Sequence, residues 1–298
     1  MSDIETLCWG YGLLEGPRVD AENNLFFSDV PNGGVYCRRP DGTVEVVIPK
    51  RRGVGGIALH ADGGVVVSGR DISHVHNGVS RQLATFDAVG TNDLFVDAAG
   101  RVVVGTLMTH PFDADLGLGD APRSGGSSTN APSGQTPERK SGDCWRIDAP
   151  GVTIKLYGGI GLTNGIGFSP DGSVIYHADT TANAIVAHDV AADGTCGNRR
   201  NLVQRRGFQP DGLAVDEAGA VWVAEFGGGC VTGFGPDGSV VGTVMLPAKQ
   251  ITSVCFGGTD RRDLYIVTAD NTEDPSRAGS VFRTRVDVPG VAVPLARI

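Results

Sequence analysis

An internal repeat most constrains the fold of this 298-residue chain. Each copy contains two small or polar residues, a short β-rich run, a turn rich in Asp and Gly, and a second β-rich run. Alternating apolar residues, such as Val102 and Val104, are typical of half-buried strands in these runs. The copies begin at Glu15, Gly55, Asn92, Asn164, Asp211 and Thr252.

The spacing of the copies indicates the architecture. Successive copies are 40, 37, 72, 47 and 41 residues apart, and further strand pairs between them bring each repeat to four strands. A period of this length is typical of propeller blades. We therefore predict an all-β, six-bladed β-propeller that forms a single domain over residues 1–298. The 45 Gly and 16 Pro suit its many turns.

The one long interval contains an insertion at about residues 113–141. This segment has almost no large apolar residues, so it buries too little surface to fold alone. We interpret it as a flexible loop on one face of the propeller. A segment without any role is the alternative.

The first residue of each repeat points to a metal site. Because the first strand of each blade lines the central channel, equivalent residues of the repeats surround one axis. Four of the six are oxygen donors: Glu15, Asn92, Asn164 and Asp211. Asn-Gly and Asp-Gly pairs are ordinary turn formers, but four polar groups around a narrow axis cost free energy unless a cation satisfies them. We predict a central metal-binding channel with these four ligands.

The donor set indicates which ion the channel would hold. Carboxylate and amide oxygens without Cys or His suit a hard divalent cation, and Ca²⁺ is the first expectation. Mg²⁺, Mn²⁺, Zn²⁺ and Fe²⁺ are also compatible, because metal supply often decides occupancy.

Five segments resemble the family that includes senescence marker protein, gluconolactonase and luciferin-regenerating enzyme, over nearly the whole chain. They are LLEGPRVD, TNDLFVDAAGRVVVGT, LTNGIGFSPDGSVIYHADT, QPDGLAVDEAGAVWVAEFGGG and ITSVCFGGTDRRDLYIVTA. The resemblance implies a six-bladed propeller hydrolase that uses a divalent metal, commonly on sugar lactones. It implies Glu15, Asn164 and Asp211 as metal ligands and Asn92 as a metal or substrate contact. Members acting on sugar lactones carry Arg where this chain has Gly90, so the natural substrate stays open.

These features favour a metal-dependent lactonase, a carboxylic ester hydrolase. The ion would polarise the lactone carbonyl, and Asp211 would act as the catalytic base toward water, with Glu15 mainly a ligand and Asn92 also binding substrate. Two alternatives remain. One is an organophosphate or ester hydrolase, or a non-hydrolytic enzyme, that uses the same ion. The other is a binding module with a structural ion. No GxSxG elbow occurs, and glycine pairs such as Gly55-Gly56 lack the strand and helix context of a dinucleotide site.

Charge and hydropathy bear on partners and location. The net charge is −9 and no long run of Lys or Arg occurs, which disfavours nucleic acid as a partner. The six scattered cysteines form no CxxC pair, and no apolar run approaches the roughly 20 residues that span a bilayer. We expect a cytoplasmic protein with reduced thiols, a small lactone or ester as its partner, and no membrane association.

Several other residues have a structural interpretation beside a functional one. Asp29 and Asp179 close equivalent hairpins and are expected to accept hydrogen bonds from strand-end amides. Trp145 and Trp222 are expected to pack within the blades. Four histidines could reach the channel mouth, although isolated histidines are usually structural: His74, His76, His110 and His177.

Overall fold

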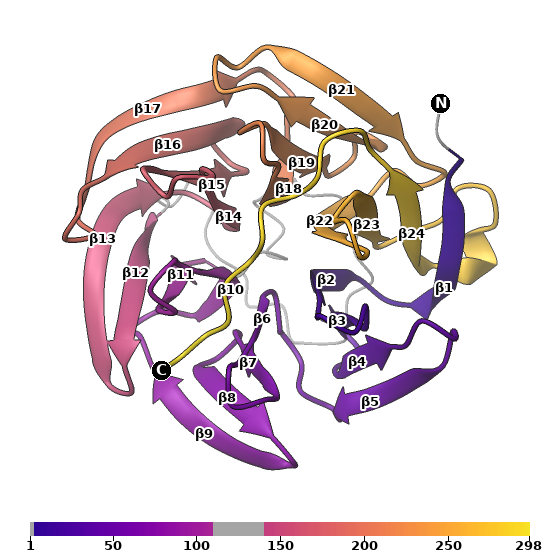
Figure 1. Cartoon of the computed structure of the whole chain (residues 1–298), viewed down its shortest axis with the longest axis horizontal. Helices are drawn as coiled ribbons and strands as arrows, with labels where there is room; N and C mark the ends of the chain where they lie inside the picture. The colour runs from indigo at the N-terminus through magenta and orange to yellow at the C-terminus, as the bar shows by residue number, and fades with distance from the viewer. Residues whose placement is uncertain (1–2, 110–139) are drawn as a thin grey trace, which may run out of the picture.

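The computed structural model describes residues 3–109 and 140–298, and in these residues it is an all-β propeller. Its 24 strands form six four-stranded antiparallel sheets, the blades, around a central axis (Figure 1). The prediction of a six-bladed propeller is confirmed. A single turn of 3₁₀ helix, η2 (Pro275–Arg277), is the one helical element in these residues.

The inner strands of the six blades surround the axis and the outer strands form the rim (Figure 1). Blades 1 to 3 contain, from inside to outside, β2 (Leu14–Val19), β3 (Leu25–Asp29), β4 (Val35–Arg38) and β5 (Val44–Ile48); β6 (Ile57–Leu59), β7 (Val65–Val67), β8 (Ile72–His76) and β9 (Val79–Ala84); and β10 (Gly90–Val96), β11 (Val102–Leu107), β12 (Gly142–Ala149) and β13 (Val152–Ile160).

The remaining blades follow the same order. Blades 4 to 6 contain β14 (Thr163–Phe168), β15 (Val174–Asp179), β16 (Ala184–Val190) and β17 (Cys196–Gln204); β18 (Pro210–Val215), β19 (Val221–Glu225), β20 (Cys230–Phe234) and β21 (Val240–Met245); and β22 (Ile251–Gly257), β23 (Asp263–Thr268), β24 (Gly279–Arg285) and β1 (Glu5–Tyr11).

Blade 6 closes the ring with strands from the two ends of the described chain. Its outer strand β1 pairs antiparallel with β24, from Glu5 opposite Arg283 to Tyr11 opposite Gly279. The chain continues from β1 into β2 of blade 1, and it enters blade 6 from β21 of blade 5. Blade 6 is therefore covalently connected to both of its neighbours. Ring closure of this kind leaves few unprotected strand edges.

The predicted insertion interrupts blade 3. Strands β11 and β12 are paired neighbours, with Gly105 opposite Cys144, so the chain between them leaves and returns at one end of the blade. Residues 113–139 of the predicted insertion lie outside the described residues. The interpretation of this segment as a flexible loop stays a prediction.

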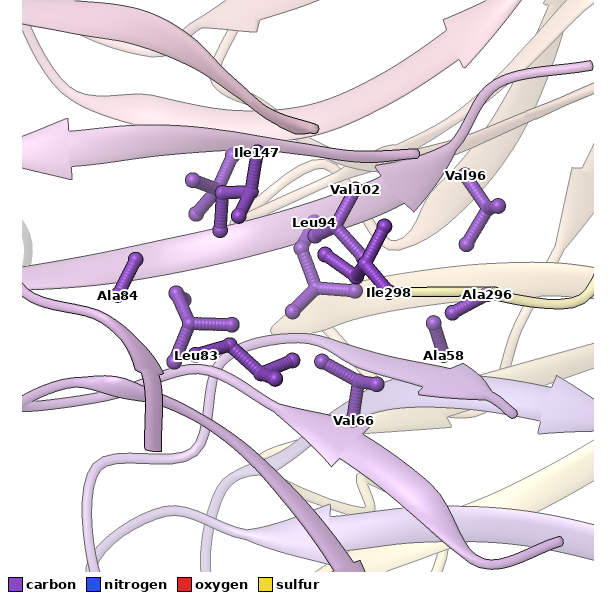
Figure 2. Close-up of a cluster of buried hydrophobic side chains, with 12 residues drawn as sticks. Ala58, Val66, Leu83, Ala84, Leu94, Val96, Val102, Ile147, Ala296 and Ile298 are labelled. Carbon is purple, nitrogen blue, oxygen red and sulfur yellow. The ribbon is translucent and has the colours of Figure 1, made fainter. Parts of the chain in front are cut away.

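The hydrophobic core is divided into clusters between neighbouring blades. Apolar side chains that alternate along the strands, and therefore stand on both faces of each sheet, fill these interfaces. In the cluster between blades 2 and 3, Val66 and Leu83 face Leu94, Val102 and Ile147 (Figure 2). The corresponding clusters join the other five pairs of neighbours.

A C-terminal segment, residues 289–298, crosses the central opening from blade 5 to blade 2 (Figure 1). At blade 5, the Val291 amide donates to the Val215 carbonyl at 2.9 Å. At blade 2, the Ala296 amide donates to the Leu59 carbonyl at 2.8 Å. Ala296 and Ile298 are buried in the cluster of Figure 2. The segment therefore covers the end of the channel where the inner strands finish.

The described residues contain no helix long and apolar enough to cross a membrane.

Candidate functional site

The four oxygen donors of the repeat lie at the beginning of four inner strands. Glu15, Asn92, Asn164 and Asp211 belong to β2, β10, β14 and β18. Glu15, Asn164 and Asp211 are buried, and Asn92 is half-buried. They are therefore grouped at the end of the channel opposite the C-terminal segment.

Each of these four strands has a β-bulge at the candidate residue. The register against the second strand shifts between Glu15 and Arg18 in β2, and between Thr91 and Leu94 in β10. It shifts in the same way in β14 and β18, after Thr163 and Pro210. A bulge removes residues from the hydrogen-bond ladder and re-aims their side chains. Asn92, Asn164 and Asp211 lie inside their bulges, whereas Glu15 is the last paired residue before its own.

Glycines beside these donors allow neighbouring inner strands to approach closely. A Cβ on Gly56 or Gly165 would overlap backbone atoms of the next blade's inner strand, and one on Gly212 would overlap Ser253. Gly55 is the second repeat's first residue, and a Cβ there would overlap the Asn92 side-chain oxygen. The second repeat therefore contributes space for Asn92 rather than a donor of its own.

Hydrogen bonds orient the two amide side chains. Asn164 donates from Nδ2 to Thr180 Oγ1 at 2.7 Å, and its Oδ1 accepts from Asn92 Nδ2. Asn92 Nδ2 also donates to the Thr163 carbonyl at 2.8 Å. The amide nitrogen of Asn164 is thus held by blade 4, which leaves its oxygen directed toward Asn92.

The two carboxylates lie in a poorly solvated environment. Burial, and then the nearby carboxylates of Asp211 and Asp93, raise the pKa of Glu15 well above its usual range. Burial and the charge of Asp93 likewise raise the pKa of Asp211, against the hydrogen bond from the Gly212 amide. Asp211 Oδ1 is buried without a hydrogen-bond partner among the described residues. These carboxylates would gain from a positively charged neighbour.

A buried ion pair that was not predicted from the sequence lies beside these carboxylates. Arg18 Nη2 lies 3.5 Å from Asp93 Oδ1, and both side chains are 6% exposed. Asp93 directly follows Asn92 within the same bulge, and Arg18 ends the bulge of Glu15. A charged side chain on an inner strand, Arg18 in β2 and Asp93 in β10, was the available signal.

The other two first residues of the repeat contribute structure. Thr252 Oγ1 donates to the carbonyls of Leu14, at 2.5 Å, and Val267, at 3.0 Å, so it ties blade 6 to blade 1. Gly55 leaves the space that the Asn92 side chain occupies, and Asn92 in turn bonds to Asn164. Contacts between neighbouring inner strands therefore continue around the axis.

The remaining candidates follow the structural interpretation. Asp29 Oδ2 accepts from the Gly12 amide at 2.9 Å, and Asp179 Oδ2 accepts from the Gly161 amide at 2.9 Å. The two tryptophans pack against the core clusters between blades: Trp145 against Phe86 between blades 2 and 3, and Trp222 between blades 5 and 6, with its Nε1 donating to Asp216.

The histidines do not share one location. His177 is fully buried behind Thr163, whose Oγ1 lies 2.6 Å from His177 Nε2. His74 lies in blade 2, toward the end that the C-terminal segment covers, with Nε2 2.8 Å from the Gly63 carbonyl. His76 is on the same strand. His110 lies outside the described residues.

Comparisons with known proteins place these residues in a family. A sequence profile described as "SMP-30/Gluconolactonase/LRE-like region" matches residues 13–270. The chain is 33% identical to 6-deoxy-6-sulfogluconolactonase of Pseudomonas putida, over 92% of this chain and 91% of that protein. It is 28% identical to a pentonolactonase of Haloferax volcanii, over 96% and 94% of the two chains.

Solved structures agree with the propeller fold. A luciferin-regenerating enzyme aligns over 100% of both chains with a TM-score of 0.82 at 23% identity. A structure described as a calcium-binding regucalcin from Agrobacterium tumefaciens aligns with a TM-score of 0.80 at 22% identity, over 100% of this chain and 98% of that one. The profile match covers most of the chain, and the chain therefore belongs to the SMP-30/gluconolactonase/LRE-like family.

Proposed function

We propose that this chain is a lactonase that opens a lactone ring by attack of water, with one divalent metal ion held by Glu15, Asn164 and Asp211. The observation that carries the proposal is the buried pair of carboxylates, Glu15 and Asp211, with an unpartnered oxygen on Asp211. Relatives that align over almost the whole chain are named as lactonases.

The donor set fits a hard divalent cation. Two carboxylates with raised pKa values and the oriented Asn164 oxygen gain free energy from a cation that replaces their lost water. The described residues contain no cluster of three or more His, Cys, Asp and Glu suited to a metal, so an amide ligand is necessary. Ca²⁺ is our first candidate, and Mn²⁺, Zn²⁺, Mg²⁺ and Fe²⁺ suit the same oxygens.

The protein residues have distinct roles in this proposal. A bound ion would supply Lewis-acid polarisation of the lactone carbonyl. Asp211 would accept the proton of the attacking water, since its free Oδ1 is available to a hydrogen-bond donor. Glu15 would chiefly hold the ion. Asn92 would contact substrate and keep the Asn164 amide in place through its Nδ2.

An arginine near Gly90 bears on substrate choice. Gly90 leaves open space, since a Cβ there would meet only the Gly69 carbonyl, at 3.4 Å. The Thr91 amide donates to that carbonyl at 2.7 Å, which holds the connection between β7 and β8 against the start of β10. Arg70 follows Gly69 and is exposed, without an ion-pair partner among the described residues. We infer that Arg70 provides a positive charge for an acidic lactone.

The anchoring of this connection supports that assignment. Arg51 Nη2 donates to Asp71 Oδ1 at 2.7 Å and to the Asp71 carbonyl at 3.0 Å. Arg70 is therefore flanked by two fixed residues, Gly69 and Asp71. A cation on a fixed backbone loses less conformational freedom when it binds an anion. The name of the sulfogluconolactonase relative describes an acidic sugar lactone.

A metal-controlled lactone panel tests the proposal. Protein stripped by exhaustive chelation, with metal loss verified by elemental analysis, should hydrolyse no lactone above the uncatalysed rate. Adding back Ca²⁺, Mn²⁺ or Zn²⁺ should restore turnover of neutral and acidic sugar lactones. Undiminished hydrolysis by metal-free protein would contradict the proposal. Turnover of aryl esters or organophosphates without lactones would favour the alternative hydrolase, and metal retention without any turnover would favour a binding module.

A further inference from the structure

A cavity of about 330 Å³ lies at the far end of the channel from Glu15 and Asp211. Its walls include Phe95, Phe168 and Phe256 near the ends of three inner strands. The C-terminal segment contributes residues 291–294 to the same cavity. The volume is within the range of small-molecule sites in proteins.

The cavity is distinct from the candidate metal site. Phe168 comes four residues after Asn164 on β14, and a strand rises about 3.3 Å per residue, so the two lie on the order of 10 Å apart along the channel. Arg18 lies between them. Its Nη2 donates to the Leu94 carbonyl at 2.8 Å and approaches Asp93, which follows Asn92. The guanidinium therefore links blade 1 to blade 3.

One donor of Arg18 is unsatisfied in this wall. Arg18 is 5% exposed, and its Nη1 donates to the Pro17 carbonyl at 2.7 Å. Its Nε is buried and has no hydrogen-bond partner among the described residues. Because a buried N–H without an acceptor is unfavourable, a ligand oxygen in the cavity would improve this arrangement once a rotation of the Arg18 side chain turns Nε toward the cavity.

The rest of the cavity wall is mainly apolar. The Phe95 ring lies beneath the Arg18 guanidinium, with its centroid 5.8 Å from Cζ, and the Phe95 and Phe168 centroids are 6.0 Å apart. Leu213 and Val215 line the cavity from blade 5. The other arginines that line it are paired: Arg101 with Asp97, and Arg146 with Asp148. Mainly apolar walls beside a buried guanidinium whose Nε lacks an acceptor favour an apolar molecule that carries an acceptor.

We propose that this cavity is a second small-molecule site, which binds a largely apolar molecule with a carbonyl or carboxylate oxygen against Arg18 Nε. The C-terminal segment forms part of its wall. The proposal is independent of the lactonase chemistry, because none of the residues assigned to hydrolysis lines the cavity.

A matched pair of probes tests the acceptor. The ketone 4-phenylbutan-2-one and the hydrocarbon n-butylbenzene have nearly the same shape and differ by one carbonyl oxygen. We expect the wild-type protein, titrated by NMR, to bind the ketone roughly tenfold more tightly, which corresponds to one hydrogen bond. Arg18→Met should reduce this ratio to one or below, because the bound carbonyl oxygen then has no donor. No saturable binding of either probe, or equal Kd values for both in the wild type, would overturn the proposal.

Further variants cover the case in which Arg18→Met fails to fold. Ala214 lines the cavity, so Ala214→Leu should weaken both probes by roughly tenfold through lost volume. Arg199→Met is the control: this arginine also donates to backbone carbonyls, those of Gly158 and Gly159, but lies outside the cavity. It should leave both Kd values unchanged. A crystal structure with the ketone beside Glu15 or Asp211, or affinity unaffected by Ala214→Leu, would refute the assignment.

Discussion

At the scale of single residues, burial of like charges dominates the candidate site. Glu15 and Asp211 are both about nine-tenths buried. Burial and the neighbouring carboxylates raise the pKa values of both side chains. Arg18 provides a positive charge beside Asp93 and Glu15. Such an arrangement favours a bound cation over three ionised carboxylates without one.

Asp211→Asn is expected to separate proton transfer from metal binding. Asparagine keeps an oxygen ligand and the side-chain shape, but it cannot accept the proton of water. We expect kcat to fall by roughly a hundredfold or more while metal content changes little. Steady-state kinetics with parallel elemental analysis checks this. As a comparison, Glu15→Gln should act mainly through metal affinity and recover part of its activity in excess metal. Near wild-type kcat in Asp211→Asn would reduce Asp211 to a ligand.

Arg70→Ala should alter substrate preference rather than catalysis itself. Loss of one charge-assisted contact should lower kcat/KM for an acidic lactone, such as a 6-phosphogluconolactone, by roughly tenfold. A neutral gluconolactone should change by less than about twofold. Arg39→Ala is the control, since Arg39 is paired with Glu45 in the β4–β5 turn at the other end of blade 1. Equal losses for both lactones would refute a charge-selective role for Arg70.

His177 should make the protein sensitive to acid. Burial lowers the pKa of His177 from its ordinary value of 6.5 to about 3. Because the folded pKa is the lower one, this imidazole stabilises the fold above pH 6.5, and the stabilisation is lost progressively as pH falls toward 3. Below pH 6.5, the unfolding free energy of the wild type should therefore fall more steeply with decreasing pH than that of His177→Gln. The two slopes should differ by about 1.4 kcal/mol per pH unit. Denaturant titrations of the wild type, His177→Gln and the half-buried control His76→Gln measure this. Parallel pH profiles for the wild type and His177→Gln would contradict it.

At the scale of strands and segments, sequence regularity separates what could be predicted from what could not. The repeat period predicts the blades and the start of each inner strand, because both depend on local alternation and turn chemistry. Arg18 and Asp93 were missed because their importance arises from contact between β2 and β10, which are distant in sequence. The path of the C-terminal segment across the channel was not predicted, because the segment lacks the strand repeat and its sequence does not indicate which blades it contacts.

The close packing of Gly55 against Asn92 allows the role of the Asn92 side chain in activity to be tested by a substitution at Gly55. A Cβ at Gly55 would overlap the Asn92 side-chain oxygen, so Gly55→Ala should displace Asn92. We expect activity to fall about as far as in Asn92→Ala, and the double variant to be no worse than either single one, because both changes act through one side chain. Kinetics of this cycle, with thermal unfolding as a folding control, provides the measurement. Additive losses would mean that Gly55 acts elsewhere.

At the scale of the whole molecule, two devices hold the ring together. Blade 6 is completed by β1 against β24, and the C-terminal segment connects blade 5 to blade 2 across the channel. The first joins neighbouring blades, whereas the second joins blades on opposite sides. The ring is therefore supported along its circumference and across its diameter (Figure 1).

The C-terminal segment that connects blades 5 and 2 predicts that substitutions at two adjacent residues differ in their effect on the stability of the protein. Ala296 is fully buried beside His60, whereas Leu295 is 41% exposed. Ala296→Asp would bury a charge and should lower the unfolding free energy by about 3 kcal/mol or more. Leu295→Asp should change it by less than about 0.5 kcal/mol. Chemical denaturation of both variants checks this. Equal stability of the two would show that the segment contributes little to the ring.

The pairing of β1 with β24 also affects the order of events on the ribosome. Glu5 and Arg283 are partners in one ladder, yet they are 278 residues apart in the chain, so β1 is synthesised long before β24. Until β24 emerges, β1 has no native partner, and Trp9 and its neighbours remain an uncovered strand edge. Closing so long a loop is entropically costly and slow. The ring therefore stays open while the residues between β1 and β24 are synthesised, and this is the period when chaperone protection or strand exchange between molecules would matter most.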